Sequence, residues 1–424
     1  MISIRALGAA SFLLGMIRNA AAINFFGNNN NKKSSLEPSE LNEKLMSGGR
    51  LFRVCLTGGP CGGKTTLQIS VADMFENMGW HVFRSPEVAT ILLGGGVEFG
   101  RLKPYQQKVF QVDILKVILQ IEDAYNNLAR DIAENGGNAV VIYDRGTMDG
   151  SAYIPKSSWE EICQEVGMSE VELRDARYDC VIHLVSAADG AEKHYGNGNN
   201  ITRLEGLKEA RLLDKNTSNA WIGHPYLEII DNSTDFEGKK KRAMETILKH
   251  IGMADLRSKD TVKRKFLIKS FDWDSAFPTP FRDLEVRYDY LVSSDDGTEI
   301  RIRRRGSSGL YVYTAMVSRK REGEVIETRR ALTYREYTLL MLKRDPRCNC
   351  LISKRRCFVW KGIYYQLDLF ESPYSGLTLL EVYTPKLLDN RSAIPPFICV
   401  EREVTEDEDY SMHRLSQVKS SEKH

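Results

Sequence analysis

The sequence lacks several features that would assign it to a special class of protein. No apolar run is long enough to cross a bilayer, and the eight cysteines among 424 residues form no disulfide ladder. Hydrophobic residues make up 42% and charged residues 27%, which excludes a mostly disordered, collagen-like or multi-span membrane protein. We expect free thiols in a reducing cytosol.

Two further absences narrow the classes of ligand. Cys348, Cys350 and Cys357 lie close together, but no second pair stands at the spacing that tetrahedral zinc requires. No RRM, KH or zinc-finger pattern is present. Neither structural zinc nor nucleic acid is therefore an expected ligand.

Charge is balanced over the whole chain but unevenly distributed along it. Lysine and arginine number 59 against 57 acidic residues, yet acids are in excess over residues 50–257 and bases over residues 258–403. The pattern changes at the same place from alternating strands and helices to closely spaced strands. The sequence therefore predicts two domains, 50–257 and 258–403. The second is expected to meet an anionic ligand or surface, unless its arginines form a solvated face.

The two ends of the chain are expected to lie outside these domains. Residues 1–49 combine an apolar run at 6–17, too short to span a bilayer, with an asparagine-rich linker. Three interpretations are open: a transit or signal peptide, a membrane-surface helix, or a disordered tail. We favour a tail with some membrane affinity. Residues 404–424 start acidic and show no apolar periodicity, which predicts a disordered tail.

A phosphate-binding motif follows the first expected strand, residues 50–57. The next residues read GGPCGGKTT and match G-x-x-x-x-G-K-[ST] at every fixed position, and residues 67–78 then predict an amphipathic helix. Glycines let backbone N–H groups turn toward phosphate oxygens, and the helix N-terminus adds partial positive charge. The expected nucleotide-binding residues are Gly58, Gly59, Pro60, Cys61, Gly62, Gly63, Lys64, Thr65 and Thr66.

The rest of this domain predicts a doubly wound parallel sheet with helices on both faces. Strands are expected at 81–85, 138–145, 178–185 and 227–231, with helices at 104–134 and 238–251. In such sheets ligands bind at the carboxyl ends of the strands. Lys64 is expected to reach the outer phosphates, and Thr65 to bind Mg²⁺. Asp144 ends a strand and would order the same Mg²⁺ or its water, unless it is an ordinary strand-end acid.

Other residues favour the kinase branch of P-loop proteins. Glu87 ends the second strand, where it would face a phosphoryl acceptor. Arg203 and Arg211 lie in a stretch, 194–221, that would close as a lid and stabilise a transferring phosphoryl group, although each also fits a solvated helix surface. Asn232 follows the fifth strand and is placed to touch a base. The Asn-Lys-x-Asp guanine signature is absent, so adenine and guanine both stay open.

The second domain is predicted to be a mainly antiparallel β barrel or tunnel. Short strands rich in arginine, tyrosine, valine and isoleucine follow one another between residues 261 and 384. Alternation places Arg301, Arg303 and Arg305 on one face of a strand, and Lys263 and Lys265 on one face of another. Inward-facing cations would form an anion-binding pocket, and outward-facing ones a solvated rim. The inward arrangement is favoured.

Two short segments of this domain resemble the CYTH, or triphosphate-tunnel, family. The strand TVKRKFL at 261–267 is similar to its opening signature E-x-E-x-K, with Lys265 matching the lysine but Thr261 and Lys263 replacing both glutamates. The segment LLEVY at 379–383 is similar to the family's E-x-E strand and keeps Glu381. In the family these acids hold the metal needed for triphosphate cleavage, so triphosphatase activity is not expected here.

A P-loop kinase-like domain followed by a degenerate CYTH-like domain resembles the TRPL translocation defect protein 14 family over residues 50–403. The resemblance implies a regulator that binds GTP with Mg²⁺, and slow GTPase or kinase activity is left open. It also implies binding of a phosphoinositide or phosphatidic acid, a cytoplasmic location with peripheral membrane association, and support of a channel-trafficking complex for photoreceptor TRP-type channels. The alternative is an ATP-dependent small-molecule kinase with a CYTH-like acceptor or regulatory domain.

Overall fold

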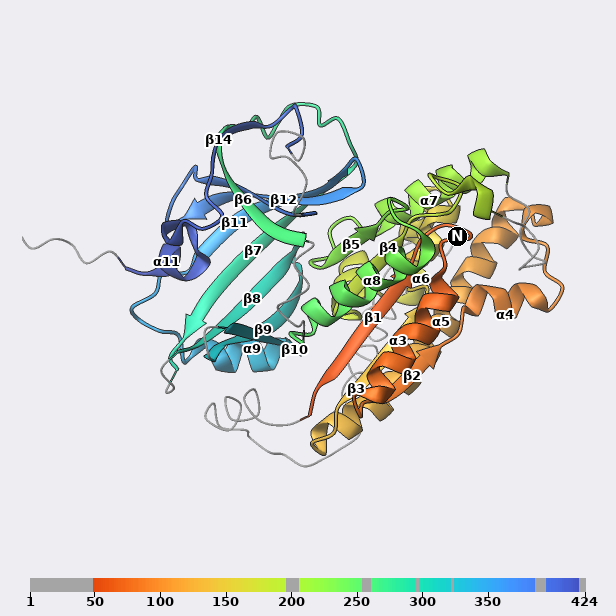
Figure 1. Cartoon of the computed structure of the whole chain (residues 1–424), viewed down its shortest axis with the longest axis horizontal. Helices are drawn as coiled ribbons and strands as arrows, with labels where there is room; N and C mark the ends of the chain where they lie inside the picture. The colour runs from red at the N-terminus through yellow and green to blue at the C-terminus, as the bar shows by residue number, and fades with distance from the viewer. Residues whose placement is uncertain are drawn as a thin grey trace, which may run out of the picture.

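The computed structural model describes residues 49–195, 206–253, 261–293, 297–321, 324–385 and 394–418. The predictions for residues 1–48, for Arg203 and for 419–424 fall outside these ranges. Two sheets make up the described part, one with five strands and one with nine. Figure 1 shows them side by side, with β5 and α8 of the first turned toward the second. Within these ranges no helix has the length and apolarity that crossing a membrane requires.

The five-stranded sheet is parallel, in the order β2-β3-β1-β4-β5. Residues on both faces of its central strands are buried, as in a sheet covered by helices on each side. The parallel α/β prediction is confirmed. The strands are β1 (Leu51–Thr57), β2 (His81–Ser85), β3 (Ala139–Asp144), β4 (Cys180–Leu184) and β5 (Leu227–Ile230).

Two helical layers enclose this sheet. Helices α3 (Lys64–Asn77) and α8 (Phe236–His250) pack on one face through residues such as Val71 and Ile247. Helices α5 (Pro104–Glu134) and α6 (Lys156–Val166) pack on the other through Leu115 and Ile162. Five further elements lie beyond the carboxyl ends of the strands: α4 (Val88–Gly94), η1 (Phe99–Arg101), η2 (Asp149–Tyr153), η4 (Glu192–His194) and α7 (Leu207–Ala220).

The second sheet is antiparallel, in the order β10-β9-β8-β7-β11-β12-β13-β6-β14. Helix α9 (Tyr334–Met341) packs on one face through Tyr337 and Leu340, against Ile300 and Ile302. The strands are β6 (Thr261–Ser270), β7 (Phe281–Leu291), β8 (Thr298–Ser307), β9 (Leu310–Arg321), β10 (Glu324–Leu332), β11 (Leu351–Trp360), β12 (Ile363–Ser372), β13 (Thr378–Pro385) and β14 (Cys399–Glu403).

The prediction of a closed barrel or tunnel is wrong. Strands β10 and β14 are the two edges of the sheet, and no pairing among the described residues joins them. We call the face that carries Arg301, Arg303 and Arg305 the inner face. The parallel-sheet domain covers one end of it, where Tyr364 donates a hydrogen bond to the His224 carbonyl (2.9 Å). The inner face of the sheet is thus covered in part by the other domain and not by closure of the sheet into a barrel.

The C-terminal residues cover the other end of the inner face. Residues 404–418 include η6 (Glu408–Tyr410) and α11 (Met412–Ser416), so the prediction of disorder does not hold for them. Val404 and Leu415 are buried in a cluster with Leu351 and Phe370. This segment docks through two buried apolar side chains. Two residues are too few to form a periodic apolar pattern in the sequence.

Candidate functional site

The loop between β1 and α3 has a backbone that accommodates little but glycine at its ends. A Cβ at Gly58 would lie 2.1 Å from the carbonyl oxygen of Leu184, and Gly58 has a φ of +131°. Gly63 and Cys61 also have positive φ values, 88° and 55°. Such left-handed turns direct successive N–H groups toward one side of a loop. The loop therefore has the form of an anion cradle.

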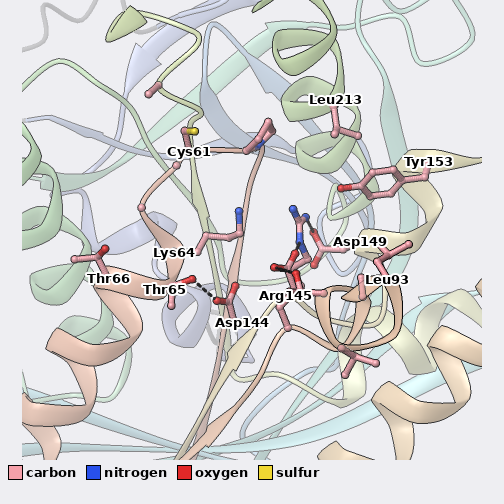
Figure 2. A pocket seen from close by; sticks show the side chains of 18 of the residues that line it. Cys61, Lys64, Thr65, Thr66, Leu93, Asp144, Arg145, Asp149, Tyr153 and Leu213 are labelled. Carbon is pink, nitrogen blue, oxygen red and sulfur yellow. Dashed lines mark hydrogen bonds and ion pairs between the residues drawn. The ribbon is translucent and has the colours of Figure 1, made fainter. Parts of the chain in front are cut away.

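Lys64 begins α3 and points into the cavity beside this loop (Figure 2). Its Nζ donates hydrogen bonds to the carbonyl oxygens of Gly58 (3.0 Å) and Gly59 (2.9 Å). Burial, together with the charge of Arg145, lowers the pKa of Lys64 to about 8. A phosphate in the cavity would favour the charged ammonium.

Asp144 and Thr65 fit a magnesium site. The Thr65 hydroxyl donates to Oδ2 of Asp144 (2.8 Å), as Figure 2 shows, whereas Oδ1 is buried and has no hydrogen-bond partner. Burial raises the pKa of the Asp144 carboxyl, although Lys64 opposes that rise. A buried carboxylate oxygen without a partner, beside a hydroxyl, offers the hard oxygen ligands that Mg²⁺ prefers. These two residues would therefore hold the metal of a magnesium–nucleotide.

Glu87 and Arg145 form an ion pair on the wall of the same cavity. The Nε of Arg145 donates to Oε1 of Glu87 (2.5 Å), and its NH1 lies 3.8 Å from Oδ1 of Asp149. Arg145 has a φ of 70°, a strained conformation of the kind that clusters at functional sites. Burial raises the pKa of Glu87, but the charges of Arg145 and Lys64 outweigh it and set that pKa at about 2. Glu87 is therefore a carboxylate at neutral pH.

The cavity that these groups share has a volume of about 2060 Å³. Usual small-molecule pockets measure about 300–1,000 Å³. Its wall includes the phosphate-binding loop and the Glu87–Arg145 pair. The cavity also extends as an apolar arm over α5. The cavity is therefore large enough for a nucleotide and a second molecule.

The geometry supports the predicted lid and base-contact residues less well than the predicted phosphate-binding residues. Arg211 is exposed, does not belong to the cavity wall, and donates to the Ala188 carbonyl and to Glu192 (2.5 and 2.6 Å). Asn232 does line the cavity, but its amide donates to the carbonyls of Ser186 (2.8 Å) and Asp189 (2.6 Å). Both donors of the Asn232 amide are thus used to hold a loop, and the role of Arg211 stays a prediction.

Comparison with known proteins identifies the first of the two domains. Residues 53–239 match the family model AAA_28, described as an AAA domain. The parallel-sheet domain is an AAA domain. Its phosphate-binding loop is therefore that of a nucleotide-binding domain. This match does not reach the TRPL translocation defect protein 14 family, which stays a prediction from the sequence.

Other comparisons add little to the AAA domain assignment. No curated protein matches the chain. One similar solved structure is described as that of the hypothetical protein NE1496 (26% identity, 37% of this chain and 97% of that chain covered, TM-score 0.28). Another is described as that of the inorganic triphosphatase NE1496 (24% identity, 38% and 97% covered, TM-score 0.28). At this TM-score the two similarities do not assign a fold or a function to this chain.

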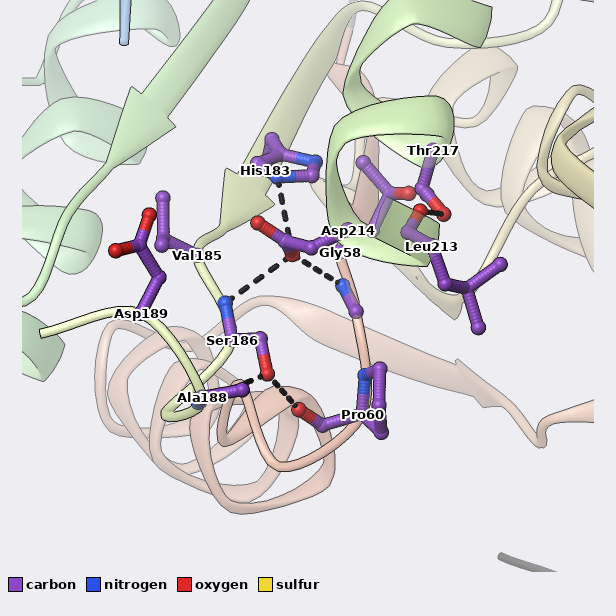
Figure 3. Close-up of polar contacts among 12 residues, drawn as sticks. Gly58, Pro60, His183, Val185, Ser186, Ala188, Asp189, Leu213, Asp214 and Thr217 are labelled. Atoms are coloured by element: carbon purple, nitrogen blue, oxygen red, sulfur yellow. Dashed lines mark hydrogen bonds and ion pairs between the residues drawn. The ribbon is translucent and has the colours of Figure 1, made fainter. Parts of the chain in front are cut away.

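Asp214, on α7 of the AAA domain, contacts the phosphate-binding loop directly, which no sequence motif signalled. Its Oδ1 accepts hydrogen bonds from the backbone N–H groups of Gly59 (2.6 Å) and Ser186 (3.1 Å), and His183 Nε2 lies 3.4 Å away (Figure 3). Burial raises the pKa of the Asp214 carboxyl, but the hydrogen bonds from His183 and the two backbone groups bring it below its ordinary value. The loop is thus pinned to α7 by a charged acceptor.

Two of the five predicted lipid-binding cations lie at the contact between the domains. Arg305 is fully buried and donates to Oδ2 of Asp175 (2.8 Å) and to the Gly223 carbonyl, both in the AAA domain. Arg303 is 4% exposed, and its guanidinium lies 5.7 Å from the ring centroid of Tyr226. Arg305 is therefore an interdomain ion-pair residue, inaccessible to a headgroup.

The other three cations are partly neutralised by acids of the inner face. Lys263 and Lys265 lie 3.0 Å and 3.3 Å from the carboxylate oxygens of Glu381. Arg301 lies 3.6 Å from Glu327. The side chains of Lys263 and Arg301 keep 46% and 22% of their surface exposed, so they are the most accessible of the five predicted cations.

Proposed function

We propose that the AAA domain binds a magnesium–nucleoside triphosphate and transfers its terminal phosphoryl group to a small acceptor beside Glu87. The observation that carries this proposal is that the Glu87–Arg145 pair and the phosphate-binding loop line one cavity. Nucleotide binding alone does not require a half-buried carboxylate beside the phosphate-binding loop, whereas a phosphoryl acceptor does. The proposal therefore favours a phosphotransferase over a switch.

The reaction would follow from charges already in place. The acceptor oxygen bonds to the γ-phosphorus while the bond from that phosphorus to the β–γ bridging oxygen breaks, and the electron pair leaves with the nucleoside diphosphate. The hydroxyl proton passes to the Glu87 carboxylate and then to solvent. Lys64 and Arg145 would stabilise the charge on the transferring group. A Mg²⁺ held by Thr65 and Asp144 would neutralise the phosphate oxygens.

Glu87→Gln is expected to lower acceptor-dependent turnover about 10²–10⁴-fold, because an amide cannot take the hydroxyl proton. Nucleoside diphosphate release would be measured with Mg²⁺–ATP and Mg²⁺–GTP across a panel of hydroxyl-bearing metabolites. Glu76→Gln, an exposed position on α3, is the matched control and should behave as the wild type. Equal turnover by Glu87→Gln, or no acceptor that stimulates the wild type, would contradict the proposal.

We infer a second candidate function, binding of an anionic phospholipid headgroup at the accessible part of the inner face. Burial raises the pKa of Tyr226 and of Tyr288, yet surrounding arginines bring both below the ordinary value. Lys263 and Lys265 share one acid, Glu381, and Arg301 and Arg329 share another, Glu327, so these groups together keep a net positive charge. A GTP-dependent regulator at a cytosolic membrane face, as the sequence resemblance implies, would use this site, and its channel-trafficking role stays a prediction.

Lys263→Glu is expected to lower binding to phosphatidic acid or phosphoinositide vesicles about tenfold or more, since each charge near an anionic surface contributes about 1 kcal/mol. Flotation with phosphatidylcholine vesicles gives the baseline. Lys361→Glu, exposed in the turn between β11 and β12, controls for net charge. Equal flotation of the two variants would place any lipid site elsewhere.

A further inference from the structure

The cavity continues from the Glu87–Arg145 pair into an apolar arm over α5. Its wall includes Leu93, Phe99, Phe110, Ile114 and Ile118. The rings of Phe99 and Phe110 lie with centroids 6.3 Å apart and planes at 42°. Aromatic and branched aliphatic walls of this kind favour a flat, apolar-faced ring over a charged chain.

A single amide interrupts this apolar surface. Gln111 of α5 is 6% exposed and lines the cavity. In the part of the chain that the structure describes, its carboxamide makes no hydrogen bond to protein, and neither amide atom is sealed away from the cavity. A ligand that fills the arm and pairs with this amide would gain free energy over one that leaves it unpaired.

Gly150 leaves the room that this amide needs. A Cβ on Gly150 would lie 3.0 Å from Oε1 of Gln111 and 3.4 Å from the ring of Trp159. The preceding residue, Asp149, accepts a hydrogen bond from the Gly146 N–H (2.7 Å) and lies 3.8 Å from Arg145. The free amide therefore adjoins the segment that positions the Glu87–Arg145 pair.

We propose that the apolar arm is the acceptor subsite, that Gln111 pairs with the edge of a nucleobase, and that the acceptor is a nucleoside. A carboxamide presents a donor and an acceptor side by side, which is the pattern of a nucleobase edge. The ring would lie between the apolar walls, and a sugar hydroxyl would reach Glu87. This inference rests on the proposed phosphotransferase function and names its substrate class.

Equilibrium binding tests the subsite without relying on phosphoryl transfer. Adenosine, guanosine, cytidine and uridine would each be titrated calorimetrically into the full chain with no triphosphate present. At least one should bind, and Gln111→Leu should weaken it about tenfold or more because the paired edge is lost. Gln120→Leu, an exposed position on the same helix, should bind as the wild type.

Gly150→Ala provides a second variant, since its methyl group would crowd the Gln111 amide, and it should also weaken nucleoside binding. Retained stabilisation by Mg²⁺–ATP or Mg²⁺–GTP shows that each variant is folded. Failure of the wild type to bind any of the four nucleosides, or unchanged binding by Gln111→Leu, would overturn the subsite. Transfer to other hydroxyl compounds without nucleoside binding would overturn the subsite and leave the phosphotransferase standing. Gln111-dependent nucleoside binding without transfer would support the subsite and refute the phosphotransferase.

Discussion

Lys64→Ala is expected to abolish the thermal stabilisation of the protein by magnesium–nucleotide. In the wild type, nucleotide at 100 times its Kd should add about 2.7 kcal/mol to the free energy of unfolding. Lys64 is buried at the start of α3, and its Nζ contacts the carbonyl oxygens of Gly58 and Gly59. Alanine removes the cation that would meet the phosphates. Differential scanning fluorimetry of the full chain with Mg²⁺–ATP and with Mg²⁺–GTP measures the loss.

Lys116→Ala, at an exposed position on α5, is the matched control and should keep the full shift. A wild-type shift with GTP alone would favour the regulator implied by the sequence resemblance, and a shift with ATP alone the small-molecule kinase. If Lys64→Ala kept the wild-type shift, the nucleotide would not bind at the P-loop.

The same lysine gives nucleotide binding a pH signature. Because burial and Arg145 lower the pKa of Lys64 to about 8, and a bound phosphate would favour the charged form, binding above that pH takes up a proton. Affinity should therefore be highest below pH 8 and fall about tenfold by pH 9. Lys64→Arg, whose guanidinium stays charged, should show no such fall.

Arg305→Met is expected to destabilise the protein by about 3 kcal/mol, because it breaks a buried ion pair between the domains. Asp175 keeps Arg174 as a partner (2.7 Å) but loses the guanidinium of Arg305 (2.8 Å). The Gly223 carbonyl loses its donor as well. The denaturation midpoint in urea, followed by tryptophan fluorescence, measures the effect.

Arg304→Met is the control on the same strand. Its guanidinium lies over the ring of the partly exposed Tyr311 (4.4 Å), on the opposite face of β8, so its loss should cost about 0.5–1 kcal/mol. A midpoint for Arg305→Met equal to that of Arg304→Met would mean that the domains do not pack through Asp175.

Local features of the sequence carried the prediction of the parallel sheet. The strand, the glycine-rich loop and α3 are adjacent in the chain, so their pattern is complete within about thirty residues. Asp144 ends a run of apolar residues that the sheet buries on both faces. Such short-range patterns predict structure well because the elements they indicate are formed by residues that are neighbours in the sequence.

Features that depend on distant contacts were not predictable. Arg305 alternates with Arg301 and Arg303 on one strand, and docking of the AAA domain alone decides that Arg305 is sealed inside. Asp214 contacts Gly59 of the phosphate-binding motif across 155 residues of sequence, and no motif surrounds Asp214 itself. The open sheet edge and the docked C-terminal segment likewise follow from which surfaces meet, which strand periodicity does not encode.

Helix α7 lies between the phosphate-binding loop and the contact between the two domains. Asp214 ties its middle to the phosphate-binding loop, and the chain leaving it reaches Gly223, whose carbonyl accepts from Arg305 of β8. Helix α7 and the residues that follow it therefore connect the phosphate-binding loop to the nine-stranded sheet. A nucleotide that moves α7 would change the free energy of the contact between the domains. By thermodynamic reciprocity, a change that weakens this contact would alter the affinity for nucleotide by the same factor.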